Sequence, residues 1–140
     1  MANITQINVR IFTVQGEDTG TEDQVYLGLG GREFRLESSS NSDMNSPDFT
    51  FHLGVDSNVE NPNLNDPRAP GLTTDDLEKY PIYIAKPGNL SNDGDDAWLL
   101  GRVDITVNPG PGQKFFSRLA GNGGSIWLRN ESGHILYIKP

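Results

Sequence analysis

Residues 18–29 of the chain read DTGTEDQVYLGL, and this stretch decides how the chain is organised. An acidic turn containing Gly20 leads directly into a segment in which Val25, Leu27 and Leu29 recur with a period of two. That period is typical of a strand with one buried face. The turn itself carries Asp18, Glu22 and Asp23. Acids crowded at the end of a strand either bind a cation or are dispersed in water.

The same alternation recurs on both sides of this stretch. It predicts strands at residues 4–14, 24–30, 32–37, 49–53, 82–84, 98–107, 126–128 and 135–138. Phase changes near Phe12 and at Gly101 indicate β-bulges in two of them. With about eight strands and almost no helix, the chain is predicted to be all-β, an antiparallel sandwich or barrel.

The connections are predicted from their turn residues. Gly30 and Gly31 mark a hairpin, and residues 38–48 form a polar surface loop that is mobile unless it is tied down. A long irregular insertion spans about residues 58–80, and within it Thr74 is the expected N-cap of one short helix. Phe115 and Phe116 are expected to cover the core.

Composition limits the function classes. The 140 residues show no change of composition that would mark a linker, so residues 1–140 are expected to form one domain. The net charge of −8 disfavours nucleic acid as a partner. There is no cysteine, no apolar run of the ~20 residues that a membrane span needs, and no visible signal peptide. The expectation is therefore a soluble protein, cytoplasmic as the sequence stands.

Three motifs resemble the PLAT, or LH2, family of β-sandwich modules, which occurs in lipoxygenases, some lipases, bacterial phospholipase toxins and polycystins. Residues 20–27, GTEDQVYL, are similar to the family's Gly, Thr, Asp, any residue, Asn, Val, Tyr or Phe, Ile or Leu. Phe51, Gly54 and Asp56 match its aromatic, Gly, Asp spacing, and residues 98–100, WLL, are similar to its Trp strand. The motifs cover roughly residues 7–107. Glu22 stands where Asp is usual, and the insertion is not part of the common pattern.

The resemblance implies a PLAT-like sandwich whose loops at one end bind Ca²⁺ and dock the module onto a membrane surface or a protein partner. The ligand candidates that it implies come from three acidic turns. They are Gly20 through its carbonyl, Glu22 and Asp23 in the first turn, Asp56 and Asn58 in the second, and Asp93, Asp95 and Asp96 in the third.

The chemistry of these turns agrees with calcium. Calcium takes six to eight oxygen ligands in adaptable geometry, whereas zinc and copper prefer the sulfur and imidazole ligands that these loops lack. Asp, Asn and Gly are also the commonest turn residues for purely local reasons. The alternative that these residues only form solvent-exposed turns and bind no ion therefore stays open.

The sequence therefore predicts a non-catalytic, calcium-dependent binding module. Carboxylates on hydrophilic loops lack the desolvated cleft that a glycosidase acid requires, and no serine lies in a hydrolase motif. Two alternatives remain open: a carbohydrate-binding sandwich with structural calcium, in which Trp98 or Trp127 would stack on sugars, and a structural subunit without metal. Nothing in the sequence predicts the oligomeric state.

Overall fold

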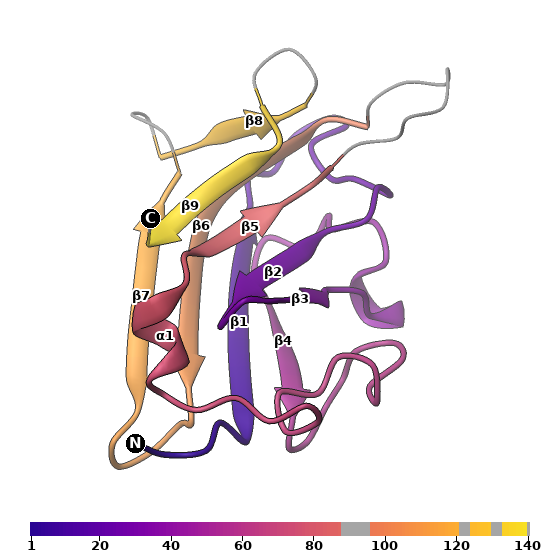
Figure 1. The fold of residues 1–140 in the computed structure, drawn as a ribbon. Coiled ribbons are helices and arrows are strands. Elements are labelled where there is room, and N and C mark those ends of the chain that lie inside the picture. The colour runs from indigo at the N-terminus through magenta and orange to yellow at the C-terminus, as the bar shows by residue number, and fades with distance from the viewer. Residues whose placement is uncertain (88–95, 121–123, 130–132, 140) are drawn as a thin grey trace.

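The computed structural model of this chain describes residues 1–87, 96–120, 124–129 and 133–139, and these form an antiparallel β-sandwich (Figure 1). The elements of the described residues are nine strands, one short α-helix and one 3-10 turn. In chain order they are β1 (Gln6–Thr13), β2 (Tyr26–Leu29), β3 (Arg32–Arg35), η1 (Ser39–Asn41), β4 (Phe49–Gly54), α1 (Asp76–Lys79), β5 (Ile82–Ala85), β6 (Trp98–Val107), β7 (Lys114–Leu119), β8 (Ile126–Leu128) and β9 (Ile135–Lys139).

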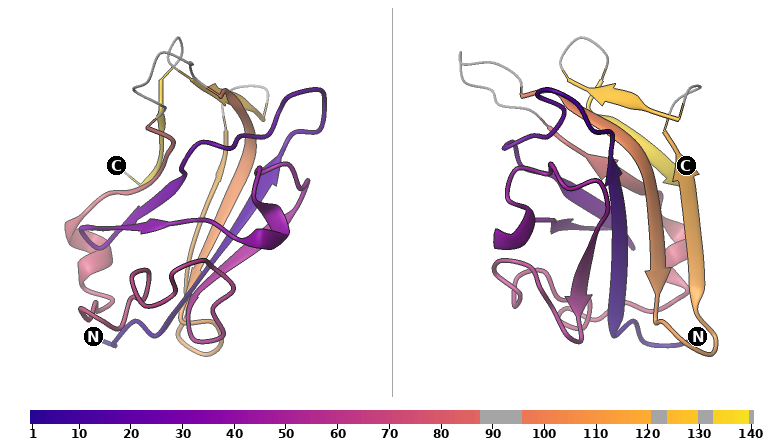
Figure 2. Two further views of the ribbon diagram at one scale, coloured as in Figure 1. Left: turned by 90° about the vertical axis from the view of Figure 1, so that its right-hand side faces the viewer. Right: turned by 180° about the vertical axis from the view of Figure 1, so that it is seen from behind.

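The strands form two sheets with the core between them. One sheet has the order β4-β1-β6-β7, with the short β8 also paired to β6, and the other has the order β3-β2-β5-β9. Figure 2 shows the first sheet from behind, with β4 at one margin and β7 at the other. The fold class predicted from the alternating pattern is confirmed, and the alternation explains it, because each strand buries one face between the two sheets.

The central strand β1 shows how the pattern produces the packing. Ile7, Val9 and Ile11 are buried, whereas the residues between them face outward. β1 pairs with β4 on one side and with β6 on the other. The register with β6 shifts between Phe12 and Thr13, opposite Gly101, so the two bulges expected from the sequence meet at one point.

Two local expectations were wrong. Lys114–Leu119 form an edge strand, and only Phe116 of its two phenylalanines packs against the core while Phe115 stays exposed. Helix α1 begins at Asp76, and the Thr74 hydroxyl oxygen accepts a hydrogen bond from the Ala2 N–H in place of capping the helix. No helix in the described part of the chain is long and apolar enough to cross a bilayer.

Gly28 in β2 lies beneath the ring of Tyr83 in the neighbouring strand β5. A Cβ atom at Gly28 would stand 2.1 Å from the nearest ring carbon. Gly28→Ala should therefore lower the free energy of unfolding by about 1–3 kcal/mol, as overpacking does, measured by urea unfolding. In a Tyr83→Ala background the same change should have no further effect, since the obstacle is gone.

Gly71 supplies the matched control for this prediction. A Cβ there would meet its nearest neighbour at an ordinary 3.6 Å, so Gly71→Ala should leave stability nearly unchanged. Equal losses for Gly28→Ala in the presence and absence of the Tyr83 ring would show that the ring is not the cause.

Candidate functional site

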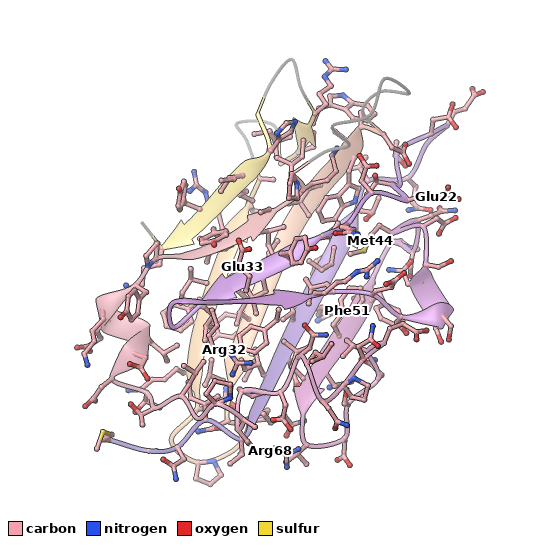
Figure 3. All side chains as sticks on the ribbon, turned by 45° about the vertical axis from the view of Figure 1, so that its right-hand side comes forward. Glu22, Arg32, Glu33, Met44, Phe51 and Arg68 are labelled. Atoms are coloured by element: carbon pink, nitrogen blue, oxygen red, sulfur yellow. The ribbon has the colours of Figure 1, made fainter. Side chains whose placement is uncertain are left out.

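The candidate site lies at the loop end, the end of the sandwich where residues 14–25, 37–48 and 96–97 meet. β1 ends here, β4 and β6 begin here, and the antiparallel register brings Thr13 next to Leu100. Figure 3 shows Glu22 at this end and Arg68 at the opposite one. Strand pairing therefore brings segments together that are far apart in the sequence.

Two threonines hold the first loop against the other two segments. Thr21 is buried, its N–H donates to the Asp43 carbonyl at 2.6 Å, and its hydroxyl donates to the Asp96 carbonyl at 2.6 Å. The carbonyl of buried Thr19 accepts from the Leu99 N–H at 2.9 Å. These bonds across the chain fix the loop although it has no regular secondary structure.

Two loops approach each other so closely at Gly20, between these threonines, that a small residue is needed there. A Cβ atom at Gly20 would stand 2.4 Å from the Asp43 carbonyl oxygen, so only glycine permits this close approach of the two loops. The glycine of the predicted calcium motif thus has a packing role between residues 16–22 and 43–45.

The loops enclose an open cleft of about 330 Å³. Its polar lining consists largely of oxygen-bearing side chains, and among the described residues no lysine or arginine belongs to it. The lining residues are Gly16, Asp18, Thr19, Gly20, Thr21, Glu22, Asp43, Asn45 and Asp96. The carboxylates of Asp18, Glu22, Asp43 and Asp96 all belong to exposed residues. Their oxygens are the hard donors that calcium prefers, so the donor set fits this ion.

The carboxylates are not arranged as a preformed metal centre. Within the described residues, no three histidine or acidic side chains come close enough together to hold a metal ion. One oxygen of Asp96 already accepts a hydrogen bond from the Glu22 N–H at 2.7 Å. A cation in this cleft would therefore rely on water or a ligand from outside for part of its coordination.

Asp23 is turned away from the cleft toward a buried lysine. The Lys86 ammonium donates to Asp23 Oδ2 at 3.0 Å, and the lysine side chain is 0% exposed. The same carboxylate oxygen accepts the Asp96 N–H at 3.1 Å. Asp23 thus joins the first loop to the end of β5 through its ion pair with Lys86, and to the segment before β6 through its hydrogen bond from the Asp96 N–H.

The second acidic turn lies at the other end of the sandwich, and this corrects the expectation that all three turns share one end. Gly54 is paired with Gln6, so Asp56 and Asn58 follow β4 at its far end. The chain then turns back, and Asn58 lies along the edge of β4, accepting from the His52 N–H at 2.7 Å and donating to the Thr50 carbonyl at 2.9 Å. Asp56 is therefore remote from the first turn, and the side chain of Asn58 is engaged with β4.

In the third turn, Asp96 lines the cleft, whereas Asp93 and Asp95 lie outside the described residues. Sequence reasoning did not select Asp43, Asn45 or Lys86. The loop of residues 38–48 was rich enough in Asp and Asn to have suggested the first two. Lys86 follows Ile82 and Ile84 at a spacing of two, so it occupies a position whose side chain points into the core. A charged residue at such a position could have been noticed in the sequence.

The aromatic residues give little support to the carbohydrate alternative. Trp98 is fully buried, and its Nε1–H donates to Thr13 Oγ1 at 2.9 Å. On the outer face of the second sheet, the rings of Tyr83 and Tyr137 are inclined at 63°, so they do not form one flat platform for a sugar. The hydrogen bond from Tyr83 to Glu33, helped by burial, raises the pKa of Tyr83 to about 12.

Comparison with known proteins identifies the fold. No family model matches the chain, and no curated protein matches its sequence. Among solved structures, the alpha toxin from Clostridium absonum is similar, with a TM-score of 0.64 at 18% identity over 99% of this chain and 32% of the toxin. The Clostridium perfringens alpha-toxin isolated from avian strain SWCP gives 0.63 at 18% identity over 98% of this chain and 32% of the toxin.

The chain spans about a third of the length of each toxin. At this identity the likeness shows the fold alone. That fold is a PLAT-like β-sandwich, in agreement with the architecture that the sequence motifs implied.

Proposed function

We propose that this chain is a non-catalytic docking module that binds Ca²⁺ in the loop-end cleft and attaches through the ion to an anionic membrane surface. The observation that carries the proposal is the cleft itself, where Asp18, Glu22, Asp43 and Asp96 gather and where the described part of the chain contributes no lysine or arginine to the lining. The resemblance to PLAT modules and the sandwich fold shared with the two toxins support the same role.

The charge of the chain explains why an ion would be needed. A net charge of −8 repels anionic phospholipids, and the gathered carboxylates make the loop end the least suitable face for direct contact. A bound calcium ion weakens this repulsion locally, because its two positive charges offset half of the charge of the four carboxylates and its remaining coordination positions bind lipid phosphate oxygens. Asp18, Glu22, Asp43 and Asp96 are the residues that would hold it.

Thermal unfolding in the presence of calcium and in the presence of a chelator tests whether the cleft binds Ca²⁺. Free Ca²⁺ at a hundred times its dissociation constant should raise the free energy of unfolding by ~2.7 kcal/mol, which would appear as a clear rise in Tm. Asp43→Asn should reduce this rise, since it removes a cleft carboxylate at nearly constant shape. Asp56→Asn, at the far end, is the matched control and should retain it. An unchanged midpoint in calcium would contradict the proposal.

Vesicle sedimentation tests whether the protein binds an anionic membrane surface through calcium. Vesicles containing phosphatidylserine should bind the protein with Ca²⁺ and release it on addition of chelator, and vesicles of phosphatidylcholine alone should bind it less. Asp43→Asn should weaken sedimentation and Asp56→Asn should not. Calcium stabilisation without vesicle binding would retain the ion and point to a protein partner in place of the membrane.

A further inference from the structure

β7 is an edge strand that carries large apolar side chains in contact with solvent. Phe115 is 54% exposed and Leu119 is 61% exposed. The strand pairs with β6 on one side over all six of its residues. On its other side β9 of the second sheet comes close, and Arg118 of β7 donates to the Tyr137 carbonyl there, but no strand, loop or side chain among the described residues bonds to the backbone of β7 along this edge. Such an edge is a template for another strand.

The margins of the sandwich formed by β4 and β3 are closed by specific contacts. At β4, Asn58 occupies the edge by bonding the backbone of Thr50 and His52. At β3, the Asn65 side chain accepts the Arg35 N–H at 2.7 Å, so the insertion covers that edge.

The remaining strands do not offer a comparable free edge. At β9, the Arg118 guanidinium of β7 donates to the Tyr137 carbonyl. β8 has three residues, too few to direct stable pairing. Within the described residues β7 is thus the long strand whose edge is open, and the right-hand view of Figure 2 shows it at the margin of its sheet.

The backbone direction of β7 follows from its pairing. The Ala120 N–H donates to the Gly101 carbonyl of β6. Because N–H groups alternate along a strand, those of Phe115, Ser117 and Leu119 point to the open edge. A second strand can therefore pair with β7 only if its residues with outward-pointing N–H groups lie opposite Phe115, Ser117 and Leu119.

We propose that two copies of this chain associate through antiparallel pairing of their β7 strands about a twofold axis at Ser117. This inference is independent of the calcium proposal. In this register Ser117 faces Ser117 of the other copy, Phe115 faces Leu119, and Phe116 faces Arg118. The pairing places apolar side chains opposite each other on the outer face and an aromatic ring opposite a guanidinium on the inner one.

Charge selects this register over its neighbours. A shift of two residues in one direction sets Lys114 opposite Arg118, and a shift in the other sets Arg118 opposite itself. Like charges directly opposite each other are destabilising in a sheet. Shifts by one residue pair outward N–H groups with inward ones and are excluded by the bonding pattern. With Ser117 at the axis, residues 115–119 of the two strands pair without either problem; shifts of four residues also avoid both problems but pair at most three residues of the strand.

The association is expected to be weak and to depend on salt. One strand pair covers less than the ~800 Å² per partner of a standard interface. Two bodies of charge −8 repel each other, so screening should favour the dimer. Sedimentation equilibrium from about 10 μM to about 1 mM should show a monomer–dimer equilibrium, shifted toward the dimer between about 0.05 and 0.5 M NaCl.

Two variants test the pairing of the two β7 strands. Ser117→Pro removes an N–H that points away from β6, a position where proline is tolerated in an edge strand. It also removes the hydroxyl that bonds to Asp104 and Arg102, so Ser117→Ala, which loses the same hydroxyl but keeps the N–H, is measured beside it and should still dimerise. Ser117→Pro should raise the dimer dissociation constant at least about tenfold, equivalent to about 1.4 kcal/mol. Leu119→Lys should act in the same direction, because it replaces an apolar contact with Phe115 of the other copy by a charge.

Leu64→Lys is the matched control, since Leu64 is 75% exposed but lies in the insertion, next to Asn65, whose side chain bonds to Arg35 of β3. It should leave the dissociation constant unchanged. A monomer at every concentration and salt would overturn the proposal. A dimer that is insensitive to Ser117→Pro and Leu119→Lys, or equally sensitive to Leu64→Lys, would overturn it as well.

Discussion

Replacing Asp23 by alanine should lower the free energy of unfolding by about 3–5 kcal/mol, the range for breaking a buried ion pair from one side. The Asp23 side chain is 14% exposed, and its partner Lys86 is 0% exposed with its Nζ 3.0 Å away. Without the carboxylate, the buried ammonium group would lose a charge that compensates its burial, and the Asp96 N–H would lose its acceptor. Urea unfolding at neutral pH measures the loss.

The double variant Asp23→Asn/Lys86→Met separates charge from packing. It removes both charges, and methionine fills much of the space of the lysine chain, so it should be more stable than Asp23→Asn alone. Asp75→Ala is the control: this aspartate is exposed at the start of α1 and makes no side-chain capping bond, so its loss should be small. Additive effects of the two single changes would show that Asp23 and Lys86 do not depend on each other.

The Asp23 result also bears on calcium. The sequence motif implied that Asp23 is a ligand, whereas the structure pairs it with Lys86. We expect Asp23→Asn to lower Tm by a similar amount with and without Ca²⁺, because the ion would be held by the cleft carboxylates. Loss of the calcium-induced rise in Tm in this variant alone, with the rise retained in Asp43→Asn, would return Asp23 to the ligand set.

Trp98→Ala is the second change with a large expected effect, again about 3–5 kcal/mol. Trp98 is the largest of the fully buried side chains. Its indole N–H donates to the hydroxyl of buried Thr13 across the β1–β6 bulge. Truncation leaves a large cavity and an unpartnered hydroxyl at the point where β6 approaches the loop end. Thr13→Val, which removes the hydrogen bond but keeps the volume, should lower the free energy of unfolding by only about 1 kcal/mol.

Trp127 is the matched control for this prediction. It lies on β8 beneath the Arg129 guanidinium and is partly exposed. Trp127→Ala should therefore destabilise the fold much less than Trp98→Ala, as measured by urea unfolding. Equal losses would mean that β8 carries more of the stability than its three residues suggest.

Most of the architecture could be read from the alternation of apolar residues. Val25, Leu27 and Leu29 predict β2, and the phase changes at Phe12 and Gly101 predict the bulge where β1 meets β6. β7 was missed because its side chains do not alternate between buried and exposed: an edge strand covered on one side leaves Phe115 and Leu119 in solvent. Period-two reasoning detects burial and thus fails where burial is absent.

The candidate site could be predicted only in part. The turn of residues 18–23 was recognisable from its acids and glycine, and Gly20, Glu22 and Asp96 do line the cleft. Asp43 and Asn45 come from a loop whose position depends on bonds from Thr21. The ion pair of Asp23 with Lys86 could not be read from the sequence, because the two residues are 63 positions apart in the chain.

By itself the sequence determined that this chain forms short strands with one buried face and acidic turns between them, because these properties depend on neighbouring residues. Which turns meet was decided only by the tertiary structure. Antiparallel pairing of β1 with β4 sends the turn at Asp56 to one end and the turn at Glu22 to the other, and the pairing of β1 with β6 brings Asp96 to Glu22. Strand order and register are set by contacts between distant segments, and no local pattern records them.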